Sequence, residues 1–184
     1  MKVTEVRAVY PKYSHAAASW RTNLWQIVVR IDTDAGITGY GCGGGGKASV
    51  EVINGHLREL VEGMPLDSGA DIQEIWDRLY RESIPYGRKG IATMAISGID
   101  LALWDALGKA ESLSVARLLS DRPRERMRCY ATGPDTEWHA AQGYSASKRP
   151  HRWTGDPAEY DRLAAWAEES RKLLGPAGRL MIDT

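Results

Sequence analysis

The sequence has little of what marks a disulfide-stabilised or nucleic-acid-binding protein. Its 184 residues include two cysteines, Cys42 and Cys129, which lie far apart and lack the spacing of a metal-binding pair. We therefore expect reduced thiols and a cytoplasmic protein. Lysine plus arginine equals aspartate plus glutamate, at 24 each, so net charge gives no indication of binding to nucleic acid or to an anionic membrane.

Long apolar runs are also scarce. No run approaches the roughly 18 residues of a membrane-spanning helix. The first residues carry charges at Lys2, Glu5 and Arg7 and have no apolar core, so a signal peptide is not expected. An apolar fraction of 43% with 26% charged residues is ordinary for a soluble fold. The length allows one domain, or one small domain and part of another.

The first half of the chain predicts a sheet followed by helices. Alternating or β-branched apolar residues favour strands at 2–10, 24–32 and 37–42. The turn at 33–36, with Gly36 suited to positive φ, makes the last two strands a hairpin, so the sheet is antiparallel. Apolar residues at helical spacing then predict helices at 48–62, 71–81 and 90–110.

The helix at 90–110 reads GIATMAISGIDLALWDALGKA and is apolar almost all round, which indicates a buried, central helix. Its small residues Ala92, Ala95 and Gly98 would let another element approach closely. Asp105 and Lys109 form an i,i+4 pair.

The pattern changes after Arg124. Strands are predicted at 127–131, 144–148 and 180–182, with a loop or short helix at 135–143 and a helix at 156–174. Strands that alternate with helices are typical of β/α units with a parallel sheet.

The segment Gly41 to Ala48, GCGGGGKA, nearly fits the phosphate-binding loop GxxxxGK[ST]. However, Ala48 offers no hydroxyl to a magnesium ion. The preceding strand also belongs to a hairpin rather than to a parallel βαβ unit. A mobile loop over a substrate pocket is the favoured interpretation, and nucleotide binding is an alternative.

Several segments together resemble the enolase superfamily. They are ISGIDLALWDALGKA, the leucines at 118–119, CYATG at 129–133, SKRPHRW at 147–153 and RLMIDT at 179–184. The chain resembles the mandelate racemase/muconate lactonizing enzyme branch, and within it the rhamnonate dehydratase group of acid-sugar dehydratases. The resemblance implies an α+β capping domain at 1–124, with a three-stranded antiparallel sheet plus helices. The first β/α units of a TIM-type barrel would follow at 125–184, and the chain would cover the first half of a member.

The resemblance also implies roles in the barrel part. Asp183 matches the first of three acidic magnesium ligands, which in this family stabilise an enediolate after the α-proton of a carboxylate substrate leaves. Lys148 is the candidate catalytic residue, and His151 and Arg152 are candidates for substrate binding. Racemases and cycloisomerases of the family carry a KxK pair at Lys148, but Pro150 stands at the second position here. That departure favours a dehydratase whose base lies on later strands.

In the capping domain, the loops at 13–23 and 42–48 would close over the substrate. His15, Trp20, Arg21 and Lys47 are the candidates there, with solvated loop residues as the alternative. Asp100, Asp105 and Lys109 are expected to be structural and to hold the capping domain to the barrel.

The expected function is therefore the N-terminal part of a Mg²⁺-dependent acid-sugar dehydratase. We expect an acid-sugar carboxylate as substrate, no nucleic-acid or membrane partner, and a homo-oligomer at full length. A complete barrel needs about 250 residues, so the 184-residue chain is expected to be a fragment, a truncated product or half of a two-chain enzyme, and inactive alone. Alternatives are a racemase or cycloisomerase of the same superfamily and a non-enzymatic α+β interaction domain.

Overall fold

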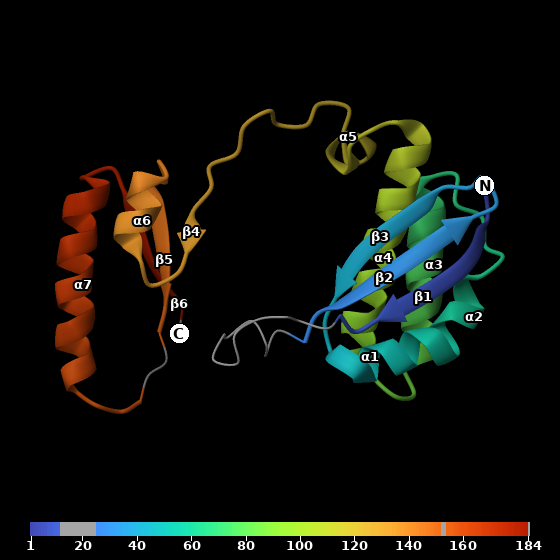
Figure 1. The fold of residues 1–184 in the computed structure, drawn as a ribbon, viewed down its shortest axis with the longest axis horizontal. Coiled ribbons are helices and arrows are strands. Elements are labelled where there is room, and N and C mark those ends of the chain that lie inside the picture. The colour runs from blue at the N-terminus through green and yellow to red at the C-terminus, as the bar shows by residue number, and fades with distance from the viewer. Residues whose placement is uncertain (12–24, 152–153, 184) are drawn as a thin grey trace. The chain divides into compact units, whose positions relative to one another are not determined.

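The computed structural model describes residues 1–11, 25–151 and 154–183. Contacts divide the chain into two units, Met1–Pro123 and Arg124–Thr184 (Figure 1). Each unit has its own sheet and its own helices, and each is described by itself below.

The sheet of the first unit contains strands β1 (Val3–Val9), β2 (Ile27–Thr33) and β3 (Thr38–Gly43), all antiparallel in the order β1-β2-β3. This confirms the predicted three-stranded antiparallel sheet. The register of β1 shifts between Val3 and Glu5. Because of this shift Val3, Val6 and Ala8 are buried, whereas Val9 is 44% exposed. The spacing of the valines alone did not predict that change of face.

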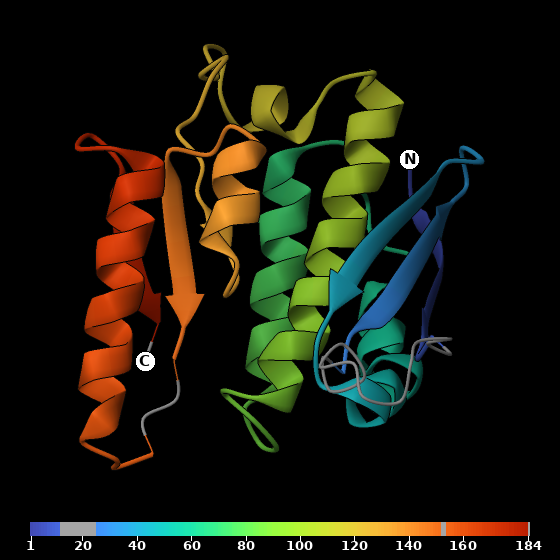
Figure 2. The same ribbon diagram turned by 60° about the vertical axis from the view of Figure 1, so that its left-hand side comes forward.

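The helices of the first unit cover one face of this sheet (Figure 2). They are α1 (Gly46–Val52), a π-helical turn (Ile53–Leu57), α2 (Arg58–Val61), α3 (Gly69–Ser83), α4 (Ile91–Glu111) and α5 (Val115–Leu119). The stretch predicted as one helix at 48–62 is thus α-helix interrupted by a π-helical turn. Helix α3 begins with a capping box, in which Ser68 Oγ accepts the Asp71 N–H and Asp71 accepts the Ser68 N–H.

Helix α4 packs on the sheet through small residues. A Cβ on Gly39 would lie 2.1 Å from the carbonyl oxygen of Ala102, and a Cβ on Gly41 would lie 2.2 Å from that of Gly98. A Cβ on Gly98 would in turn meet a methyl group of Val29 at 2.8 Å. Glycines on the inward face of β3 and small residues on α4 therefore bring the two backbones into direct contact, as the small residues of this helix predicted.

By length and mean hydropathy, α4 is apolar enough to cross a membrane, although charged residues interrupt its apolar run. Its composition has another explanation in this fold. Ala95, Ile99, Ala102, Leu103 and Ala106 are at most 1% exposed within the core of the first unit. The apolar residues of α4 thus serve packing on the sheet.

Two charged residues of α4 bind the edge strand β3. The Asp105 carboxylate accepts the Tyr40 N–H at 2.8 Å and the Lys109 ammonium at 2.6 Å, and Lys109 Nζ also donates to the Thr38 carbonyl at 2.9 Å. Burial raises the pKa of Asp105, but these hydrogen bonds outweigh it and the net pKa lies below its ordinary value. Asp105 and Lys109 thus connect α4 to β3 within the first unit, and their expected role in holding the capping domain to the barrel stays a prediction.

The second unit contains a parallel sheet with the strand order β4-β5-β6. Its elements are β4 (Ala131–Thr132), α6 (Thr136–Ala141), β5 (Ala146–Pro150), α7 (Ala158–Leu174) and β6 (Arg179–Asp183). The predicted β/α units are confirmed. The strand predicted at 127–131 is wrong in its extent, because residues 127–130 form no strand and Met127 is 73% exposed.

Candidate functional site

The carboxyl ends of β5 and β6 bring two of the predicted site residues together. In the parallel register Lys148 is paired with Met181 and Pro150 with Asp183, so Lys148 and Asp183 lie on the same face of the sheet. The Nζ of Lys148 is 3.0 Å from Oδ2 of Asp183. Ends of parallel strands are where β/α barrels place their functional groups.

The Lys148 ammonium has a second neighbour on β4's side of the sheet. Its Nζ lies 5.5 Å from the centre of the Tyr130 ring, within the range of a cation–π contact. The hydrogen bond to Asp183 raises the pKa of Lys148 above its ordinary value, with smaller contributions from the Asp183 charge and from Tyr130. Lys148 therefore presents a cationic side chain beside Asp183 and Tyr130.

A buried hydrogen-bonded chain lies on the opposite face of β5. Trp166 Nε1 and Ser170 Oγ, both on α7, donate to Thr136 Oγ1 at 3.2 and 3.1 Å. Thr136 Oγ1 is 3.4 Å from Ser147 Oγ, which is 2.8 Å from Nδ1 of His139. Because an indole can only donate, the chain can run as Thr136 to Ser147 to His139, with Nδ1 accepting.

This hydrogen-bonded chain connects α6 and α7 to Ser147, the residue next to Lys148. It thereby holds β5, the strand that carries the lysine, in place. Sequence reasoning missed it. Its hydroxyl and imidazole groups come from three elements, and no spacing along the chain connects them. The only indication in the sequence is that Ser147 alternates with Lys148 on a predicted strand, so the two must face opposite sides.

His151 links the strand end to α7. Its backbone N–H donates to the Asp183 carbonyl at 2.8 Å, and its Nε2 lies 3.6 Å from Oε2 of Glu159. Glu159 also accepts the Thr154 N–H and hydroxyl at 3.1 and 2.8 Å, and the backbone bond from Thr154 leads the causes that lower the Glu159 pKa. The ring of His151, a predicted substrate-binding group, thus faces the first turn of α7.

Lys47 lies in the first unit, beside a hollow of about 320 Å³. The hollow is lined by Tyr10, Trp25, Gly45, Gly46, Lys47 and Ala48. The Gly46 N–H donates to the Trp25 carbonyl at 2.7 Å, which closes the glycine segment against Trp25. The other candidates His15, Trp20, Arg21 and Arg152 lie outside the described residues.

The phosphate-loop alternative requires a strand of a parallel βαβ unit before the glycines. Here the preceding strand, β3, is the edge of an antiparallel sheet, and α1 after the glycines has only seven residues. The glycine segment therefore lacks the structural context of a nucleotide-binding loop.

A magnesium ion in a protein takes a near-octahedral set of oxygen ligands. Asp183 offers a hard carboxylate, 56% exposed, at the end of a strand. Within residues 1–11, 25–151 and 154–183, no group of three or more His, Cys, Asp or Glu side chains could hold a metal ion. The residues described thus supply one suitable ligand and not a complete site.

Comparison with known proteins agrees with the fold described above. Residues 2–120 match the family described as mandelate racemase/muconate lactonizing enzyme, N-terminal domain. A protein from Caldivirga maquilingensis, provisionally named L-rhamnonate dehydratase, is 36% identical over 144 residues, which are 78% of this chain and 35% of that protein.

Solved structures give the same result. L-rhamnonate dehydratase from Gibberella zeae superposes with a TM-score of 0.81 at 27% identity, over 99% of this chain and 51% of that one. A magnesium complex of rhamnonate dehydratase from the same organism gives 0.80 at 26% identity, over 99% and 52%. The 3,6-anhydro-D-galactonate cycloisomerase from Zobellia galactanivorans gives 0.76 at 28% identity, over 100% and 51%.

The chain spans about half the length of these structures and about a third of the Caldivirga protein. Its capping-domain match covers more than half of the chain, and the superpositions extend through the parallel strands. The chain belongs to the mandelate racemase/muconate lactonizing enzyme branch of the enolase superfamily.

Proposed function

We propose that this chain is the N-terminal part of a magnesium-dependent dehydratase that acts on acid sugars. The observation that carries the proposal is the Lys148–Asp183 pair at the ends of two parallel strands, in a chain related to rhamnonate dehydratases. The reaction would remove the proton α to a carboxylate and eliminate water from the neighbouring carbon.

In this proposal Asp183 is one of the carboxylate ligands of the metal. The bound divalent cation would supply positive charge to the substrate carboxylate as its α-proton becomes acidic. Asp183 is well suited to this role because it is exposed and because its backbone carbonyl is held by the His151 N–H at 2.8 Å.

Lys148 in this proposal binds the substrate and stabilises negative charge, and it does not take the proton. Its Nζ is already within hydrogen-bond distance of a carboxylate oxygen, which shows that the side chain can reach an anion at this edge. The residue two positions on is Pro150, which has no group that could act as a base. Position 150 therefore supplies no general base, which favours a dehydratase over a racemase or cycloisomerase that uses a lysine at this position.

The proposal is tested on the protein as it is isolated from its native source and on variants of that protein. Acid sugars, L-rhamnonate among them, are incubated with Mg²⁺, and formation of a 2-keto-3-deoxy acid is measured. Asp183→Asn should lower kcat/KM by at least about a hundredfold, and a chelator should abolish turnover. Asp161→Asn, an exposed carboxylate on α7, is the charge-matched control and should leave turnover unchanged. Full activity of the Asp183 variant would refute the role of Asp183.

A further inference from the structure

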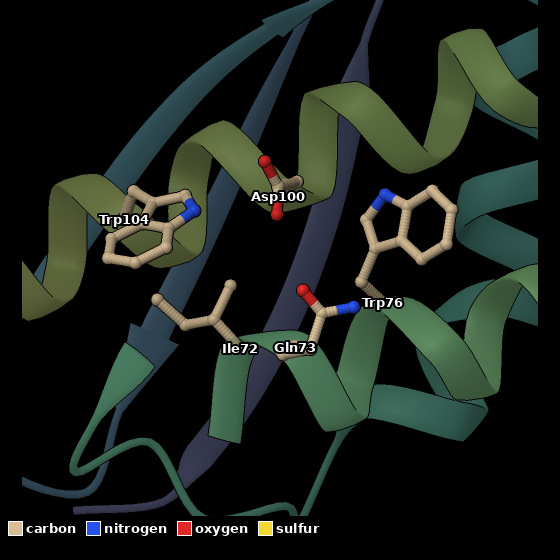
Figure 3. Close-up of a pocket in the computed structure, with 5 residues that line it drawn as sticks. All are labelled: Ile72, Gln73, Trp76, Asp100 and Trp104. Carbon is tan, nitrogen blue, oxygen red and sulfur yellow. The ribbon is translucent and has the colours of Figure 1, made fainter. Parts of the chain in front are cut away.

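Helices α3 and α4 of the first unit border an open hollow of about 360 Å³ that the proposed reaction does not use (Figure 3). It is lined by Ile72, Gln73, Trp76, Asp100 and Trp104. Figure 3 shows one indole on each side, with Asp100 between them on α4 and Gln73 facing it from α3. Its volume is within the range of small-molecule sites.

Both indole rings are held in place by their neighbours. Trp76 is stacked on Tyr80, with ring centres 5.3 Å apart and planes 10° from parallel. The Trp104 ring lies over Gly69, where a Cβ would come within 3.0 Å of the ring. The walls of the hollow are therefore formed before any ligand arrives, and this lowers the entropic cost of binding.

Two of the polar groups at the hollow are hydrogen-bond acceptors, and the indole nitrogens of Trp76 and Trp104 are turned toward Asp100 (Figure 3). Gln73 donates its amide Nε2 to Asp77 Oδ1 at 3.0 Å, which leaves its carbonyl oxygen as the group on the other side. The Asp100 carboxylate accepts a hydrogen bond from Trp104 and keeps further lone pairs. A carboxylate and an amide carbonyl thus face each other across the hollow (Figure 3), and a ligand that binds both must be a donor.

Asp100 is half-buried, and no neighbouring cation among the described residues compensates the free-energy cost of burying its charge. Burial raises its pKa, and the only opposing influence is the Trp104 hydrogen bond. In the part of the chain that the structure describes, no ion pair within 4.0 Å includes Asp100. A carboxylate in this position favours a ligand that brings positive charge.

We propose that this hollow binds a guanidinium group, either of a free small molecule or of an arginine side chain. A guanidinium is planar and can stack on an indole face, and it is more weakly hydrated than an ammonium. Its several N–H donors lie in one plane, so it can donate to the Asp100 carboxylate and to the Gln73 carbonyl at once. An ammonium has no flat face to stack on an indole, and a neutral amide would leave the carboxylate charge unbalanced.

The test is a titration of the 184-residue chain with methylguanidinium chloride at constant ionic strength. The indole N–H resonances of the seven tryptophans are followed by NMR and assigned with Trp76→Phe and Trp104→Phe. The signals of Trp76 and Trp104 should shift saturably with a millimolar Kd. N-methylurea has the same shape without the charge and should bind at least about ten times more weakly. N-acetyl-arginine methylamide should bind at least as tightly if the natural source is an arginine side chain, and more weakly if it is a free guanidinium compound.

Asp100→Asn keeps the shape and removes the charge, so it should raise the Kd at least about tenfold. Gln73→Leu, at an exposed position, should raise the Kd about threefold, and it tests the site without changing the half-buried carboxylate. Glu74→Gln on the same helix is the charge-matched control and should have no effect. Equal shifts with the cation and with N-methylurea, shifts spread over all seven indoles, or unchanged binding by both site variants would overturn the proposal.

Discussion

The ammonium of Lys148 lies 3.0 Å from the carboxylate of Asp183, across two neighbouring parallel strands that end at the same edge of the sheet. The two residues are brought together by the parallel register, because Lys148 and Asp183 then face the same side of β5 and β6. A lysine and an aspartate at this edge can bind a carboxylate and a metal ion, which are two of the requirements of the proposed reaction; a general base is the third.

The substitution Lys148→Met distinguishes a catalytic role of the Lys148–Asp183 pair from a purely structural role. The pair is partly exposed, with Asp183 at 56%, so we expect little change in the free energy of unfolding. Turnover of an acid sugar by the native-source protein should fall at least about a hundredfold, because charge stabilisation near the substrate is lost. Arg162→Met breaks the exposed pair with Asp156 in the same way and should leave turnover intact. Equal activity of the two variants would show that Lys148 has no part in catalysis.

Gly41→Ala tests the direct contact of β3 with α4. The new Cβ would lie 2.2 Å from the Gly98 carbonyl oxygen, so the helix or the strand must move. We expect a loss of about 1–3 kcal/mol in the free energy of unfolding, measured with urea. Gly55→Ala is the control, because a Cβ there has no neighbour within 4 Å and the helix gains a better helix former. A destabilisation by Gly55→Ala as large as that by Gly41→Ala would argue against close packing as the cause.

Asp105→Ala should loosen the edge of the first sheet. The Tyr40 N–H would lose its acceptor and Lys109 one of its two partners, at a cost of about 1–3 kcal/mol. Hydrogen exchange should become faster at the Tyr40 amide, whereas the amides of the central strand β2 should exchange as before. Unchanged protection of Tyr40 would mean that the carboxylate does not hold this strand.

The capping box of α3 makes part of the stability depend on pH. Hydrogen bonds from the backbone of Asp67, and from the side chain and backbone of Ser68, hold the pKa of Asp71 below its ordinary value. A lowered pKa in the folded state stabilises the fold above the unfolded pKa of about 4. This stability is lost as the pH falls through the folded value. Asp71→Asn should therefore destabilise the chain at pH 7 and have progressively less effect in acid.

Ser68→Ala should cost about 1 kcal/mol, because the Asp71 N–H loses its side-chain acceptor. Urea unfolding at several pH values measures both variants. A destabilisation by Asp71→Asn that stays constant down to pH 2 would contradict the assignment of the pH dependence to Asp71.

The sequence predicted the order and type of most elements because their signals are local. The turn at 33–36 joins two β-branched segments and thereby defined the hairpin, and Gly98 on an apolar helix indicated a close contact. The partner of that contact, β3, could not be read from the helix itself. Likewise Asp105 and Lys109 form a recognisable i,i+4 pair, but their second partners, Tyr40 and Thr38, are set by tertiary packing.

The second unit shows where local signals fail. The apolar residues at 127–130 suggest a strand, yet a strand exists only where a neighbour pairs with it, and pairing begins at Ala131. The proposed role of Asp183 rests on a family resemblance and on its place at a strand end. The hollow beside Asp100 was not predicted, since Trp76 and Trp104 meet only when α3 packs on α4.

The central claim is that the protein eliminates water from an acid sugar, and proton NMR in D₂O tests it most directly. The native-source protein is incubated with L-rhamnonate and related acid sugars in the presence of Mg²⁺. The account predicts a 2-keto-3-deoxy acid that appears only with the divalent cation and carries deuterium at carbon 3. Exchange at carbon 2 with an epimer as product, formation of a cycloisomerised product, or no reaction with any acid sugar would contradict it.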